Sequence, residues 1–214
     1  MPLPQLDYKG LFHDPRMFDS PSTFSAAGFD VMKQAASHNI MVGRHASADN
    51  YVFKKYSRDV PLGDQNANYK KRLRGAAKIR DVIDRHRLRH IVVPRKWLYE
   101  LPEEFSSSRR HKSCILIAEW MDILSVSETT KRYRTIDTAI LDELCRVLFH
   151  FRGFDAAIHN LRFTTSGQIA FIDTESWDRS PRRGSRVFWR IAEELPRELR
   201  KRIARTFDRL EEDD

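Results

Sequence analysis

Three polar residues in the C-terminal half of the sequence have the types and spacing needed for phosphoryl transfer. Asp155 and Asn160 lie five positions apart after an apolar helical segment, and Asp173 follows thirteen positions beyond Asn160, at the end of a strand. One carboxylate can orient or deprotonate an attacking hydroxyl, while an amide oxygen and a second carboxylate hold Mg²⁺ against the phosphates. Asn and Asp both offer the hard oxygen ligands that Mg²⁺ prefers. The pattern therefore predicts a metal-dependent phosphoryl-transfer site.

This pattern resembles the protein kinase superfamily, in which a catalytic loop ending in D-x-x-x-x-N is followed by a hairpin and a metal-binding aspartate. The similarity covers about residues 38–178. It implies that Asp155 is the catalytic aspartate, Asn160 a metal ligand and Asp173 the chief metal ligand, with ATP and Mg²⁺ as cofactors. A D-x-x-x-x-N sequence alone is weak, and an ordinary loop with a capping aspartate is the alternative. The position between a long helix and a strand–turn–strand makes the match more specific.

The resemblance also implies a lysine on an upstream strand that grips the α- and β-phosphates. Lys54 ends the sequence Tyr51-Val52-Phe53-Lys54, which fits that strand, and Lys55 competes with it. Side chains alternate between the two faces of a strand, so Lys54 shares its face with the small Val52, which would cover the adenine. Lys55 would bring bulky aromatic rings into the same pocket. Lys54 is therefore the expected phosphate-binding lysine.

An apolar strand that runs into an acidic residue, Leu116–Asp122, resembles the kinase hinge. The resemblance implies that backbone groups near Glu119 and Met121 bind the adenine edge, with Ala118 at the gatekeeper position. The glycine-rich loop over the phosphates is reduced to Val42–Ser47, which holds the single glycine Gly43.

Other positions depart from the family pattern. Gly153-Phe154 stands where His-Arg precedes the catalytic aspartate. Asp173-Thr174-Glu175 replaces D-F-G and is similar to the Asp-x-Glu of choline and aminoglycoside kinases, so Glu175 would assist the metal or form a salt bridge. The helix expected to supply a glutamate partner for the lysine has none, and Asp81 is its best candidate.

Apolar periodicity and turn residues predict the elements that position these groups. Residues 1–37 are expected to be an irregular lead-in with a short helix near 24–36. From residue 38 the order is strands, one helix, strands, a long helix, a hairpin and short helices. The expected strands are 40–43, 50–56, 90–94 and 113–119, the hairpin is 161–164 with 168–172, and the helices are 66–86, 136–151 and segments around Pro196.

The expected fold class is α+β. The kinase resemblance specifies a bilobal protein kinase-like fold with a β-sheet N-lobe and a reduced, mainly helical C-lobe. The minimal domain would span 38–214, with an N-lobe at about 38–118, a hinge at about 119–123 and a C-lobe at about 124–214.

Composition restricts the class of protein further. Of 214 residues, 41% are hydrophobic, enough for a core, and 38 basic against 30 acidic residues give a net charge of +8. A basic surface suits an anionic partner but does not select one. Two cysteines argue against a disulfide scaffold or a cysteine zinc site. Without an apolar run of about 20 residues or a Sec-type signal peptide, we expect no membrane span, and a protein that is cytoplasmic or secreted into a host cell.

These observations predict an ATP- and Mg²⁺-dependent kinase that modifies Ser/Thr or Tyr hydroxyls of a protein substrate, similar to the compact effector kinases of some bacterial pathogens. A small-molecule kinase of the choline or aminoglycoside type is the first alternative. An ATP-binding pseudokinase that serves as an interaction module is the second. Basic residues cluster at Lys70–Arg74, Arg109–Lys112 and Arg200–Arg205, but these clusters carry no recognisable base-reading motif. Nucleic acid is therefore not the expected partner.

Overall fold

The structure is a computed structural model of the 214-residue chain, and it describes residues 2–35, 40–57, 60–106, 112–150, 156–175 and 195–212. The fold is α+β, as the sequence predicts. The chain forms two compact units, the first made of Met1–Leu73 with Arg95–Trp120 and the second of Arg74–Pro94 with Met121–Asp214. Within the described ranges, no helix is long and apolar enough to cross a membrane.

The first unit contains a five-stranded antiparallel sheet with the order β1-β2-β3-β6-β5. The expected strands 40–43, 50–56 and 113–119 are confirmed as β2, β3 and β6 of this sheet. Two strands of this sheet, β1 and β5, were not predicted. The strands are β1 (Phe29–Ala35), β2 (Ile40–His45), β3 (Tyr51–Tyr56), β5 (Lys96–Glu100) and β6 (Cys114–Glu119).

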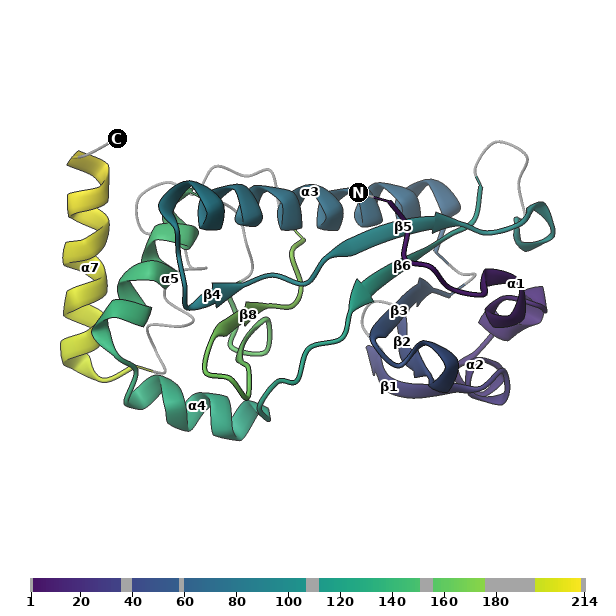
Figure 1. The fold of residues 1–214 in the computed structure, drawn as a ribbon, viewed down its shortest axis with the longest axis horizontal. Coiled ribbons are helices and arrows are strands. Elements are labelled where there is room, and N and C mark those ends of the chain that lie inside the picture. The colour runs from purple at the N-terminus through teal and green to yellow at the C-terminus, as the bar shows by residue number, and fades with distance from the viewer. Residues whose placement is uncertain are drawn as a thin grey trace. The chain divides into compact units, whose positions relative to one another are not determined.

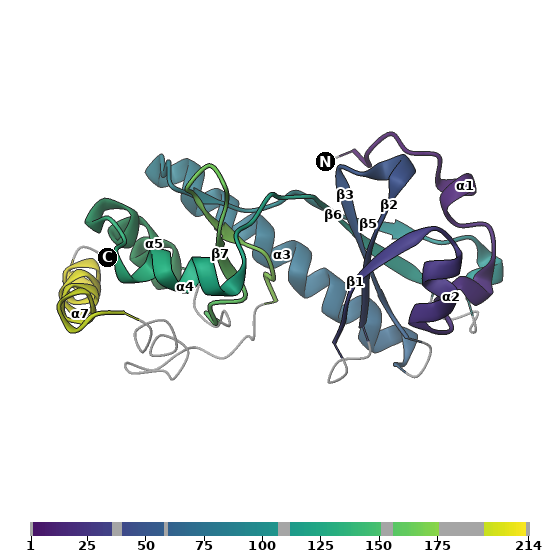
Figure 2. The ribbon, with the colours of Figure 1, turned by 90° about the horizontal axis from the view of Figure 1, so that it is seen from below.

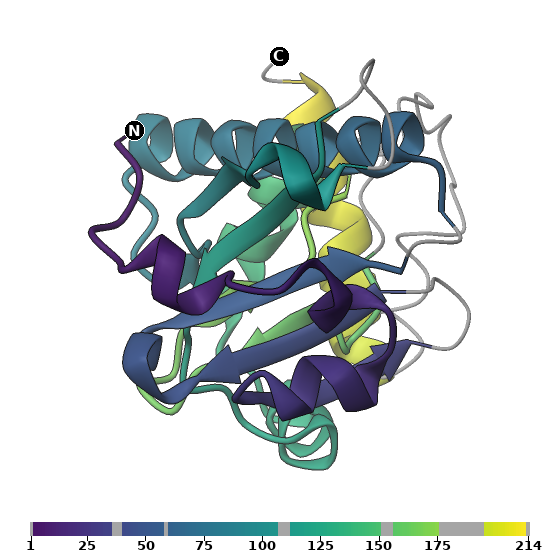
Figure 3. The same ribbon diagram turned by 90° about the vertical axis from the view of Figure 1, so that its right-hand side faces the viewer.

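Each face of this sheet is covered by helices of the same unit. The N-terminal segment places α1 (Tyr8–Leu11), the 3₁₀ turn Pro15–Phe18 and α2 (Pro21–Ala26) over one face (Figures 2 and 3), where its apolar side chains form a core with Phe53 and Ile117. The start of α3 (Leu62–His86) packs on the other face.

The expectation of an irregular N-terminal lead-in with a helix near 24–36 is wrong. A capping box between Ser20 and Thr23 starts α2 at Pro21, three residues before that range. Gly28 then takes a φ of 91°, the left-handed conformation that glycine adopts at little cost, and the chain turns into β1. The rings of Phe24 and Phe29 stack across this turn with centroids 4.2 Å apart. Burial of these two rings fixes a helix–turn–strand where periodicity suggested one helix.

The second unit joins a small sheet to three helices (Figure 1). Strand β4 (Ile91–Val92) pairs parallel to β8 (Ile169–Phe171), which pairs antiparallel to β7 (Leu161–Phe163). The expected hairpin of β7 and β8 is confirmed. The helices are α4 (Val126–Arg134), α5 (Thr138–His150) and α7 (Arg197–Glu212), and α5 lies between β4 and α7.

The core of the second unit gathers the apolar faces of its elements. Ile79 and Val82 from α3 meet Leu141 and Leu144 from α5, together with side chains from β7 and β8. The long helices predicted at 66–86 and 136–151 are therefore confirmed over Leu62–His86 and Thr138–His150. Helix α4 was not predicted from the sequence; Ser125 and Glu128 start it with a capping box.

Candidate functional site

The hairpin of β7 and β8 brings two of the predicted metal ligands together. Asn160 immediately precedes β7, and Asp173 follows β8 after one intervening residue, Ile172. Because the two strands run antiparallel, the start of β7 lies opposite the end of β8. The amide of Ile172 donates a hydrogen bond of 3.0 Å to the carbonyl oxygen of Asn160. The backbone segments that carry Asn160 and Asp173 are therefore adjacent. Asp155 lies outside the described residues.

In the segment after β8, two acidic residues flank a buried threonine. Thr174 is fully buried, whereas Asp173 and Glu175 on either side of it are half-buried. The amide of Glu175 lies 3.3 Å from Oδ1 of Asp173 and donates to it, a local bond that restrains this carboxylate. Two carboxylates thus occupy the positions that follow the strand.

These residues have the chemistry that Mg²⁺ requires. Asn160 and Asp173 offer hard oxygen ligands on adjacent backbone segments. Within the described ranges, no three His, Cys, Asp or Glu side chains lie close enough together to hold a metal ion by themselves. Mg²⁺ commonly takes one or two carboxylates from the protein and completes its shell with waters and substrate phosphates. An amide oxygen and a carboxylate therefore fit a nucleotide-bound Mg²⁺.

In the first unit, Lys54 occupies a central position of the sheet. It is half-buried on β3 and lies opposite Leu116 of β6 in the register. Two residues further on, Tyr56 is on the same face of the strand, and its ring lies 5.3 Å from that of Tyr69 of α3. Lys54 is therefore on the sheet face that α3 covers.

Lys55 points to the opposite face and is held by other side chains. It is 3% exposed, and its ammonium donates to Oε1 of Gln65 at 2.9 Å and to Oγ of Ser113 at 3.0 Å. The same ammonium lies 5.7 Å from the ring centroid of Phe18. A buried ammonium with these partners connects β3 to α3 through Gln65 and to the residue before β6 through Ser113.

The register places further residues on the face of Lys54. Val52 lies opposite Ala118, and Ala118 lies opposite Lys96 of β5. Lys96 is 3% exposed, so this face carries a second, buried positive charge that the sequence analysis missed. The available signal for a strand face was the apolar Leu98 two positions after Lys96. However, a lysine in a strand normally indicates a face that is exposed to solvent.

Glu119 is engaged within the sheet. Its amide donates to the carbonyl oxygen of Arg95 at 3.0 Å, and its carboxylate accepts from the amide of Arg95 at 2.8 Å and from the guanidinium of the same residue. The amide of Trp120 donates to Asn50 at 2.8 Å. The expected adenine contact near Glu119 therefore cannot use either of these two amides. Met121, the other expected hinge contact, is half-buried.

Gly43 was expected both in the strand 40–43 and in the reduced phosphate loop 42–47, and the structure places it in a strand. It is inside β2, opposite Val31 of β1 and Phe53 of β3. A Cβ atom at this position would lie 2.9 Å from a ring carbon of Phe24 and 3.1 Å from the carbonyl oxygen of Asp30. The close approach of these atoms accounts for the glycine, and a phosphate-binding loop is not required to explain it.

No buried position of α3 between residues 62 and 73, all of which the structure describes, is occupied by an acidic residue that could pair with Lys54. Gln65, Tyr69 and Arg72 are buried there, while Asp64 is exposed. Asp81, the expected partner of the lysine, is exposed as well. Its carboxylate has the exposure of a solvated surface group.

Comparison of the chain with the models of known protein families and with curated protein sequences finds no match.

Proposed function

We propose that this chain is an ATP- and Mg²⁺-dependent phosphotransferase with a bilobal protein kinase-like fold, which phosphorylates hydroxyl groups of a protein substrate. The observation that carries the proposal is the β7–β8 hairpin, because it brings the backbones of Asn160 and Asp173 together. In protein kinases the equivalent asparagine and aspartate hold the metal ions that bridge the phosphates of ATP.

The first unit supports the same proposal. Protein kinases carry the phosphate-binding lysine on the third strand of a sheet, with a helix that supports it. Here Lys54 lies on β3, α3 follows β3 along the chain, and α3 packs on the face of Lys54. Val52 and Ala118 lie opposite each other on that face and would be the small side chains beside the adenine.

Each residue would contribute to one step of the transfer. Bound Mg²⁺ would neutralise charge on the phosphates. Asn160 and Asp173 would hold the ion through their side-chain oxygens, and Lys54 would bind the α- and β-phosphates. Asp155 would orient the acceptor hydroxyl and take its proton, as the new oxygen–phosphorus bond forms and the bond to the β-phosphate oxygen breaks.

The test is incubation of the protein with labelled ATP and Mg²⁺, alone and with cell extract, with transfer read by mass spectrometry. Asp173→Ala should abolish Mg²⁺-dependent turnover and leave the melting temperature near that of the wild type, because Asp173 is half-buried at the end of a strand. Asp208→Ala, on the exposed side of α7, is the matched control and should retain activity. Full turnover in folded Asp173→Ala would remove Asp173 from the site.

A small-molecule kinase is the second candidate, and the arrangement around Thr174 favours it. The burial of Thr174 leaves Asp173 and Glu175 together at the surface, as the Asp-x-Glu resemblance requires. Protein and metabolite panels assayed with the same preparation distinguish the two substrates. Binding of ATP without transfer to any acceptor would instead indicate a pseudokinase.

A further inference from the structure

The turn that connects α3 to β4 has an unusual backbone conformation. Arg87, directly after the helix, takes a φ of 51°, a left-handed conformation that non-glycine residues rarely adopt. The amide of Leu88 donates to the carbonyl oxygen of Ile83 at 3.0 Å and closes the helix end. Surrounding contacts must hold such a turn, because its backbone conformation is unfavourable.

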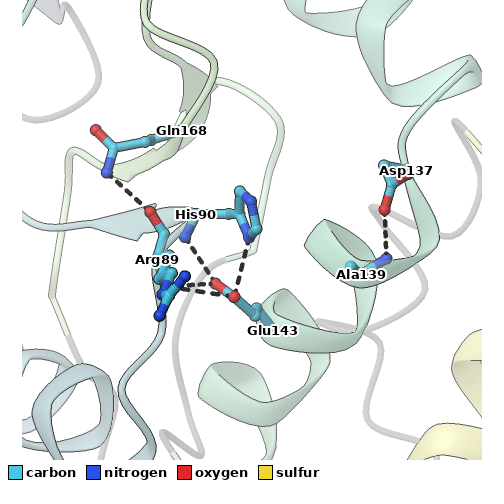
Figure 4. A network of polar contacts seen from close by, with 6 residues as sticks. All are labelled: Arg89, His90, Asp137, Ala139, Glu143 and Gln168. Carbon is cyan, nitrogen blue, oxygen red and sulfur yellow. Dashed lines mark hydrogen bonds and ion pairs between the residues drawn. The ribbon is translucent and has the colours of Figure 1, made fainter.

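Three of the contacts on this turn come from one carboxylate of α5. Glu143 accepts hydrogen bonds from the amide of Arg89 at 3.0 Å, the amide of His90 at 2.8 Å and Nδ1 of His90 at 2.9 Å (Figure 4). The side chain of Glu143 is 20% exposed, so these bonds are partly shielded from water. Hydrogen bonds to an ionised acceptor are shorter and stronger than those between neutral groups.

The same two residues of the turn bind β8 through their carbonyl groups. The carbonyl oxygen of Arg89 accepts from Nε2 of Gln168 at 3.0 Å, and that of His90 accepts from the amide of Ile169 at 2.7 Å. Beyond them β4 continues as the parallel partner of β8. Arg89 and His90 therefore connect Glu143 on one side to β8 on the other.

β8 leads directly to the candidate metal ligands. Ile172, one residue beyond the strand, donates to the carbonyl oxygen of Asn160, and Asp173 follows. We propose that Glu143 is a positioning residue: by fixing the α3–β4 turn it sets the position of β8 and thereby of Asp173 and Asn160 toward Mg²⁺. The role in metal binding rests on the proposed function, whereas the control of β8 does not.

Asp142 provides a matched comparison on the same helix. Its carboxylate also accepts three hydrogen bonds, two from the guanidinium of Arg202 at 2.6 and 3.1 Å and one from Oγ1 of Thr206 at 3.1 Å. These bonds lead to α7 and not to β8. Loss of Asp142 should therefore lower stability to a similar degree without changing the metal site.

The test compares Glu143→Gln with Asp142→Asn. An amide keeps the shape of the carboxylate but is neutral and has one acceptor oxygen in place of two, so its hydrogen bonds from the turn should be fewer and weaker than those to the ionised carboxylate. In Glu143→Gln we expect amide exchange at Ile169 and Ile172 to accelerate about tenfold, and the Mg²⁺ concentration for half-saturation of ATP binding to rise about tenfold, the low end of the effect of groups that orient metal ligands. Asp142→Asn should leave both within about twofold.

Each result decides a part of the proposal. Unchanged exchange at Ile169 in Glu143→Gln, or an equal change in Asp142→Asn, overturns the control of β8. Faster exchange with an unchanged Mg²⁺ requirement overturns the metal-positioning role alone. A wild-type protein that binds no Mg²⁺·ATP overturns the proposed function and that role with it, while exchange at Ile169 still reports on β8. If Glu143→Gln does not fold, His90→Leu removes the bond from Nδ1 without supplying another donor, and it should shift both readouts about threefold in the same direction.

Discussion

At the residue scale, the two neighbouring lysines of β3 differ in what surrounds their ammonium groups. Lys55 is buried and hydrogen-bonded to Gln65 and Ser113, whereas Lys54 is half-buried on the face that α3 covers. Removal of a buried hydrogen-bonding group leaves its partners without water or protein to bind, which costs more than loss of an exposed one. Lys55 therefore contributes to the stability of the sheet, while the proposed function assigns Lys54 to the phosphates.

Substitution of each lysine by methionine should separate these contributions. Lys55→Met should lower the free energy of unfolding by about 1–3 kcal/mol, because Gln65 and Ser113 lose a buried partner. Lys54→Met should reduce ATP affinity and turnover with a smaller change in stability. Thermal melting and ATP titration of both variants measure the two effects. The reverse order, with ATP affinity lost in Lys55→Met alone, would assign the phosphates to Lys55.

Asp142 provides a prediction for acid stability. Burial opposes ionisation of this carboxyl, but hydrogen bonds from Arg202 and Thr206 outweigh it and lower the pKa of Asp142 below its ordinary value. A lowered pKa stabilises the folded state at neutral pH, and the gain is lost as the pH falls below the unfolded value of about 3.9. The difference in melting temperature between wild type and Asp142→Asn should therefore be largest at pH 7 and shrink below about pH 4. A constant difference over this range would contradict the charged pair.

At the scale of elements, the sequence predicts the helices and strands whose apolar periodicity is uninterrupted. These are β2, β3, β6, the β7–β8 hairpin, α3 and α5. The missed strand β5 depends on contacts distant in sequence. It begins with Lys96, which is buried although a lysine in a strand normally indicates a solvent face. The role of Glu143 was missed for the same reason, because its partners lie more than fifty positions away in the sequence. The positions of Asn160 and Asp173 beside a hairpin could be predicted, since the turn between them is local.

The glycine of β2 tests how tightly the N-terminal segment packs on the sheet. In Gly43→Ala the new methyl group would meet Phe24 at 2.9 Å and the backbone oxygen of Asp30 at 3.1 Å. A ring can shift but a paired strand cannot move easily, so we expect a loss of about 1–3 kcal/mol in the free energy of unfolding. Chemical denaturation measures this loss. An alanine variant as stable as the wild type would show that the helices over this face can move aside.

At the scale of the whole molecule, the chain crosses between its two units three times. The crossings follow Leu73, Pro94 and Trp120, so each unit contains segments from distant parts of the sequence. The last crossing falls within residues 119–123, where the sequence analysis expects a hinge. Lys54 belongs to the first unit, and Asn160 and Asp173 belong to the second. The proposed function therefore requires both units to be folded, because nucleotide binding is assigned to residues of each.

Asp155→Asn should separate nucleotide binding from chemistry in the intact protein. Mg²⁺ and ATP are assigned to Asn160, Asp173 and Lys54, so ATP affinity should stay within a few-fold of the wild type. Turnover should fall by about 10²–10⁴, the range for loss of a positioned general base. A melting curve provides the control, because asparagine has nearly the size of aspartate.

If Asp155 only caps its loop, the variant will melt earlier in proportion to its lost activity. If the protein is a pseudokinase, the wild type will bind ATP without transfer and the substitution will change nothing. Intact stability and ATP binding with a collapse in transfer are expected only if Asp155 acts on the acceptor hydroxyl.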